Sequence, residues 1–223
     1  MPGTAIEAAF VAALEMALQP FGFDYDSESE WFSRSHGHFD DIFELCLSAC
    51  SGSLKITPVA LVQVKPVQWF YNRSYQRGTE AARQSGAIGV ELKALLDVSN
   101  EIEWYIHTER DIPCAVAEVA AVFREHVIPF FQRYSTIEAI DEALNSKPRK
   151  ECLVSIYPAR AAEGLIIAKL LGRPDFDKLA KFYERKVKRE WSGVDLPEFQ
   201  ALVKDLRENG RLLQDAWNTP SNT

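Results

Sequence analysis

The 223-residue chain is predicted to have an α+β fold, with an antiparallel sheet of four to five strands, helices packed on one face, and a C-terminal helical extension. Apolar residues alternate with polar ones through much of residues 39–64, which predicts strands, while other segments repeat apolar positions at helical spacing. Residues 1–146 hold 10 Lys and Arg against 21 Asp and Glu, net −11, whereas residues 147–223 are net +4. We therefore predict an α+β domain over 1–146 and a small all-α extension of three helices over 147–223.

The first predicted element is a helix over residues 5–19, because Thr4-x-x-Glu7 has the capping-box pattern and apolar residues follow at helical spacing. Strands are predicted next over residues 31–35, 39–49 and 54–64. Pro58 lies inside the third of these, and a proline there requires an edge position, a bulge or a break.

Two further strands, over residues 88–96 and 102–108, are predicted to pair through the turn at Asp97–Asn100. A helix then begins at Asp111 and is expected to break or kink at Pro129. Ser135-x-x-Glu138 begins a second short helix, and the polar segment 145–150 marks the predicted domain boundary. The extension is predicted to have helices over residues 158–171, 176–191 and 196–209, the last ending at Gly210.

Four motifs carry a resemblance to a known family. They are F-G-F at Phe21–Phe23, W-F-S-R at Trp31–Arg34, T-E-R-D-I at Thr108–Ile112 and P-F-F-Q-R-Y-S-T-I-E-A-I at Pro129–Ile140. With the order of elements, they resemble the bacterial domain-of-unknown-function family 4304 over residues 5–145. The resemblance implies a bacterial, cytoplasmic α+β domain with no established activity. It supplies no catalytic residue to carry over.

The composition indicates which cellular compartment and which classes of partner to expect. The N-terminus lacks a basic n-region, no apolar run approaches the ~18 residues of a membrane helix, and the four cysteines form no C-x-x-C pair. We therefore expect a cytoplasmic protein without a membrane partner or a cofactor. The acidic residues 1–146 argue against a primary nucleic-acid role, because nucleic-acid binding depends on neutralising phosphates.

His36-Gly37-His38-Phe39-Asp40-Asp41 allows two interpretations. Two histidines on one strand face followed by a carboxylate can hold a metal, and the run resembles the H-x-H-x-D-H start of metallo-β-lactamase-like hydrolases. Asp41, however, stands where that pattern has a histidine. The favoured interpretation is a tight turn at Gly37 whose histidines point into solvent. The alternative is a metal-dependent hydrolase using His36, His38 and Asp40.

A second metal-site alternative is a nuclease of the restriction-enzyme type. Glu91-Leu92-Lys93, with Asp40 or Asp41 earlier in the chain, matches the acidic residue and (D/E)-x-K arrangement that such nucleases use. Strand alternation explains these residues more simply, because it leaves Glu91 and Lys93 solvated.

The segment around residues 67–78 interleaves aromatic residues with arginine, and it supplies the predicted binding residues Trp69, Tyr71, Arg73, Tyr75 and Arg77. These residue types are enriched at binding hot spots, and they could also stack on nucleobases. The alternative interpretation is that Trp69 and Phe70 fill the core and the arginines pair with the acidic surface. The basic face of residues 178–190 is interpreted as solvated, or as a surface for an acidic partner.

Together these features predict a non-enzymatic protein-binding module, because the sequence contains no assembled catalytic set. One form is an immunity-like role, in which the acidic surface captures a basic toxin. The sequence leaves homo-oligomerisation open.

Overall fold

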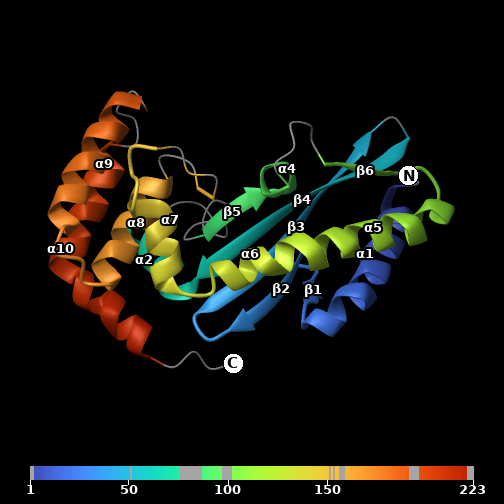
Figure 1. The fold of residues 1–223 in the computed structure, drawn as a ribbon, viewed down its shortest axis with the longest axis horizontal. Coiled ribbons are helices and arrows are strands. Elements are labelled where there is room, and N and C mark those ends of the chain that lie inside the picture. Colours follow the sequence, from blue (N-terminus) through green and yellow to red (C-terminus); the bar gives the residue numbers. More distant parts are fainter. Residues whose placement is uncertain are drawn as a thin grey trace. The chain divides into compact units, whose positions relative to one another are not determined.

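The computed structural model describes residues 3–50, 52–75, 87–96, 102–150, 152, 154–155, 159–190 and 196–219. It confirms the α+β class, with an antiparallel sheet, helices and a C-terminal helical region (Figure 1). The chain forms two compact units. The first consists of Met1–Ser35, Asp41–Leu61 and Gly89–Arg133, and the second of His36–Asp40, Val62–Ile88 and Tyr134–Thr223. The sequence-based division after residue 146 stays a prediction.

The sheet has the strand order β1-β2-β3-β4-β5, and β6 also pairs with β4. The strands are β1 (Asp24–Asp26), β2 (Trp31–His36), β3 (Phe39–Cys50), β4 (Ser53–Val64), β5 (Ala87–Glu91) and β6 (Trp104–Ile106). The turn between β2 and β3 contains Gly37 at φ 59°, a left-handed conformation that favours glycine. β4 continues through Pro58, which lies beyond the stretch Leu54–Ile56 that pairs with β6.

The predicted strand over residues 88–96 is wrong beyond Glu91, because a short helix, α4 (Leu92–Leu95), follows β5 directly. Leu92 is buried. A short apolar run is compatible with either a buried strand or a buried helix, so the sequence pattern does not distinguish them. The predicted pairing with the next strand is also wrong, since β6 pairs with β4. The predicted turn at Asp97–Asn100 lies outside the described residues.

The first unit contains α1 (Gly3–Leu18), which packs against α5 (Ile112–Val122). Short 3-10 segments, Gln19–Phe21 and Glu109–Asp111, follow α1 and precede α5. Asp111 lies at the end of that second segment. Its carboxylate accepts hydrogen bonds from the backbone N–H groups of Thr108 and His107, at 2.8 and 3.0 Å, and so caps the start of the segment. Phe123 lies in the core, with its ring centroid 5.0 Å from those of Phe23 and Phe43.

Pro129 was expected to break or kink the helix, but the helical chain continues through it. A π-helical segment, Phe123–Val127, joins α5 to α6 (Ile128–Arg133), so the three run on as one helical rod (Figure 1). The backbone N–H of Ile128 bonds to the carbonyl of Phe123 instead of the carbonyl four residues back. The wider turn relieves the clash that a proline ring makes with the preceding turn of an α-helix.

The second unit is built around α8 (Ala159–Leu170), which packs with α2 (Lys65–Tyr75), α7 (Ile137–Asn145), α9 (Phe176–Glu190) and α10 (Leu196–Asn218). Nearly every residue of α8 is buried, as expected for a helix enclosed by others. In the described chain after residue 147 the structure has three helices, as predicted.

The predicted end of the last helix at Gly210 is wrong, because α10 continues to Asn218. Gly210 faces the side chain of Lys169 on α8, and a Cβ atom there would overlap the Lys169 Cε atom. The glycine therefore leaves room for the Lys169 side chain and does not end the helix. None of the described helices is both long and apolar enough to cross a membrane.

Candidate functional site

Trp69 and Arg73 form an exposed surface on α2, which we call the α2 surface. A spacing of four residues places both side chains on one face of the helix. The Trp69 side chain is 44% exposed, and the Arg73 guanidinium carbon lies 5.9 Å from its ring centroid. Arg73 Nε lies 3.6 Å from a carboxylate oxygen of Asp205 on α10, and Ser74 donates a hydrogen bond to the same oxygen at 3.0 Å. The guanidinium is therefore held beside the ring.

The other predicted binding residues do not join this surface in the described structure. Tyr71 is only 4% exposed and belongs to the core. Residues two apart point to opposite sides of a helix, so α2 separates Tyr71 from Trp69. The side chain of Tyr75, and all of Arg77, lie outside the described residues.

The predicted metal ligands of the β2–β3 turn have separate neighbours. The ring of His36 stacks on Phe39 with centroids 5.6 Å apart, and that of His38 stacks on Trp217 at 4.6 Å. Asp40 lies 3.2 Å from Lys65 Nζ in an ion pair. The histidine rings are half-buried, so the expectation that they point into solvent is wrong. No group of three or more His, Cys, Asp or Glu among the described residues could hold a metal ion.

The carboxylates of the nuclease alternative are paired with cations. Glu91 lies 2.8 Å from Lys93 Nζ, and the buried Asp41 accepts a hydrogen bond from Arg34 at 2.6 Å. Arg34 also donates to the carbonyl of Phe21 at 3.0 Å and lies over the ring of Phe23. The Arg34–Asp41 pair therefore ties the start of β3 to the segment after α1.

Hydrogen bonds shift the pKa values of three groups in the first unit, Glu103, Lys55 and Cys114. Glu103 accepts a hydrogen bond from Lys55, which lowers the pKa of Glu103 and raises that of Lys55. Cys114, which opens α5, is exposed and lies 3.4 Å from the Glu118 carboxylate, and this hydrogen bond raises the pKa of its thiol. The helix dipole would act in the opposite direction.

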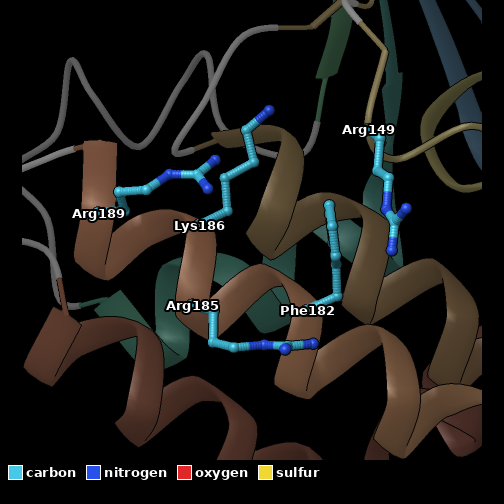
Figure 2. Close-up of a pocket in the computed structure, with 5 residues that line it drawn as sticks. All are labelled: Arg149, Phe182, Arg185, Lys186 and Arg189. Carbon is cyan, nitrogen blue, oxygen red and sulfur yellow. The ribbon is translucent and has the colours of Figure 1, made fainter.

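A basic depression lies along α9, and we call it the α9 pocket. It has a volume of about 410 Å³ and is lined by Arg149, Phe182, Arg185, Lys186 and Arg189. The four α9 residues follow an i, i+3, i+4, i+7 pattern, which places them on one helix face (Figure 2). A separate face of α9 carries Leu179, Tyr183 and Val187 into the core.

Arg149 reaches the α9 pocket from the segment that follows α7, and buried Arg160 holds that segment. Arg160 is 1% exposed and donates two hydrogen bonds to the carbonyl of Leu144, at 2.7 and 3.1 Å. It also donates to the carbonyls of Lys147 at 3.2 Å and Lys150 at 2.6 Å. A cation at the C-terminal end of α7 is also favoured by the helix dipole.

Asn145 also bonds the start of this segment to α8 and α9. Its side-chain amide donates to the carbonyl of Gly164 at 2.8 Å, and its oxygen lies 2.7 Å from the Tyr183 hydroxyl. The absence of a Cβ at residue 164 is required, because one would lie 2.6 Å from that same oxygen. Segment 145–150, predicted from sequence as a boundary, is thus bonded to α8 and α9.

A third cluster of the second unit centres on Arg173. Its guanidinium lies 2.6 Å from Asp141 and 2.8 Å from Asp175. The hydrogen bond with Asp175, together with that of Asp141, raises the pKa of Arg173, and the Arg173 bond lowers the pKa of Asp175. This cluster links α7 to the turn before α9.

Sequence analysis missed the α9 pocket. The spacing of Phe182, Arg185, Lys186 and Arg189 is a usable signal, but the sequence alone predicts a solvated face or a surface for an acidic partner, and not a pocket. Nothing in the local sequence points to Arg149, because its position depends on the bonds made by Arg160.

Comparisons with protein-family models, with curated proteins and with solved structures found no match. The resemblance to family 4304 therefore stays a prediction, and function has to be argued from the chain's own residues.

Proposed function

We propose that the protein is a non-enzymatic protein-binding module that contacts its partner through the α2 surface. The observation that carries this proposal is the half-exposed ring of Trp69 beside the tethered guanidinium of Arg73. Tryptophan and arginine are among the residues most enriched at binding hot spots, because they bury large areas and direct hydrogen bonds.

The α2 surface is also pre-organised. Arg73 is held by Asp205 and by the face of the Trp69 ring, so less side-chain freedom is lost when a partner binds. The rotamers of a flexible arginine would otherwise oppose association by about 0.5–1.5 kcal/mol. Trp69 supplies the apolar anchor and Arg73 the directed donors.

Charge supports one form of this proposal, an immunity-like role. Residues 1–146 carry a net charge of −11, which attracts a basic partner and speeds its approach. In this account charge brings the partner to the protein, and the α2 surface provides the close contact.

The experiment compares affinity capture from the native host by three baits: the unchanged chain, Trp69→Ala and Tyr105→Ala. Tyr105 is the matched control, since its side chain is also 44% exposed but lies in the first unit. We expect one protein to be recovered by the unchanged chain and the control and to be lost with Trp69→Ala. With that protein purified, Trp69→Ala should weaken the Kd about 30-fold, as expected for a hot spot. Equal recovery by all three baits would refute the proposal.

A further inference from the structure

We propose that the α9 pocket binds a nucleotide, a planar base carrying two or more phosphate groups. This site is independent of the α2 surface and of the proposed function, and it lies wholly within the second unit.

The charge of the lining calls for a polyanion. Three arginines and one lysine line the pocket, and in the described part of the chain its lining contains no Asp or Glu. Arg185 donates a hydrogen bond to the carbonyl of Lys181, which carries no full negative charge. Arginine guanidinium groups match phosphate oxygens in pairs, so a ligand with several phosphates suits a lining of three arginines and one lysine.

Phe182 adds a requirement for a planar group. Its half-buried ring packs edge-on against Tyr183, with ring centroids 5.5 Å apart. Figure 2 shows the ring on the same side of the pocket as the side chain of Arg149. An aromatic base can stack on such a ring, and the adjacent guanidinium can add a cation–π contact.

The pocket is of suitable size, and the backbone that presents Arg149 is preformed. Its volume of about 410 Å³ falls within the range of small-molecule sites, roughly 300–1,000 Å³. Arg149 is presented by a segment that Arg160 holds at three carbonyl oxygens, so this wall does not have to be ordered by the ligand. A long nucleic acid is disfavoured because the acidic residues 1–146 would repel it.

Isothermal titration calorimetry of the full chain at about 0.15 M ionic strength, where the Debye length is about 8 Å, tests the proposal with ATP, inorganic tripolyphosphate and adenosine. We expect ATP to bind more tightly than tripolyphosphate, and tripolyphosphate more tightly than adenosine. Arg185→Glu should weaken ATP at least about tenfold, because it replaces a phosphate donor with a repelling charge. Lys188→Glu is the matched control, an identical charge change at an exposed α9 residue outside the pocket lining, and it should change the Kd less than about threefold.

Phe182→Leu separates the base from the phosphates, because it keeps an apolar side chain but removes the stacking face. It should weaken ATP about fivefold or more while leaving tripolyphosphate within about twofold. Absence of ATP binding would overturn the proposal, as would equal losses in Arg185→Glu and Lys188→Glu. Equal affinity for ATP and tripolyphosphate, unaffected by Phe182→Leu, would overturn the assignment of a nucleotide. Binding of poly-glutamate in place of ATP would overturn it in favour of an acidic peptide.

Discussion

Replacing Arg160 with methionine should destabilise the second unit more than any exposed arginine substitution. The change removes the guanidinium that donates to the carbonyls of Leu144, Lys147 and Lys150 while keeping an unbranched side chain in a position that is 1% exposed. It also removes a cation from the C-terminal end of α7.

The magnitude follows from the three carbonyls. A buried acceptor left without a donor costs about 1–3 kcal/mol. Leu144 keeps the Tyr183 hydroxyl at 3.1 Å, and the bonds to Lys147 and Lys150 are only partly buried, so water can replace them in part. Methionine carries no charge, so the cost of burying the Arg160 guanidinium away from water disappears, and this offsets part of the lost stability. We therefore expect the free energy of unfolding to fall by about 2–4 kcal/mol, out of a typical total of about 5–15 kcal/mol.

Urea denaturation followed by circular dichroism measures this loss. Arg110→Met is the control, because Arg110 is exposed, and its effect should stay within about 0.5 kcal/mol. At a temperature where Arg160→Met remains folded, its affinity for ATP should also fall, since the segment carrying Arg149 is no longer held. A loss for Arg160→Met no larger than that of the control would refute the structural role given to this side chain.

Three further predictions concern single contacts. Gly164→Ala should lower the free energy of unfolding by about 1–2 kcal/mol in the same assay. The added methyl group overpacks against the Asn145 side-chain oxygen, and this cost exceeds the gain in helix propensity. An increase in the free energy of unfolding would contradict this. Arg173 lowers the pKa of Asp175. The ionised Asp175 carboxylate therefore stabilises the fold fully at pH values above its ordinary pKa of 3.8. This stabilisation is lost as the pH falls from 3.8 through the lowered pKa. The decline in stability measured between about pH 5 and pH 3 should be shallower for Asp175→Asn, and identical slopes would count against the pair. Glu118→Gln should lower the pKa of Cys114 and speed the alkylation of its thiol by iodoacetamide, with the rate measured by peptide mass spectrometry. An unchanged alkylation rate would show that the Glu118 hydrogen bond does not control the pKa of this thiol.

The alternating strands were predictable because one strongly apolar face specifies both the strand and its register. β3 runs over Phe39–Cys50, against a prediction of 39–49, and the helices whose caps and apolar spacing agree were also found. Errors arose where tertiary contacts decide the outcome. Gly210 looks like a helix end until the neighbouring Lys169 is known, and Leu92 fits a buried strand as well as a buried helix.

The candidate sites were harder to predict because they depend on distant residues. Trp69 and Arg73 were selected by residue type, and their role in binding stays a prediction. Tyr71 was predicted to join them, but the helical conformation of α2 buries it. The α9 pocket needs Arg149, which lies 33 residues before Phe182 and is positioned by a buried arginine on a third element. No local pattern encodes such an arrangement.

Site-specific photo-crosslinking in the native host tests the central claim most directly. A photo-reactive amino acid at residue 72, beside Arg73 on α2, is compared with one at Tyr105. We predict a discrete adduct with one protein from residue 72, its disappearance when Trp69→Ala is added, and no such adduct from residue 105. An adduct that survives Trp69→Ala, or one that forms only from residue 105, would contradict the account.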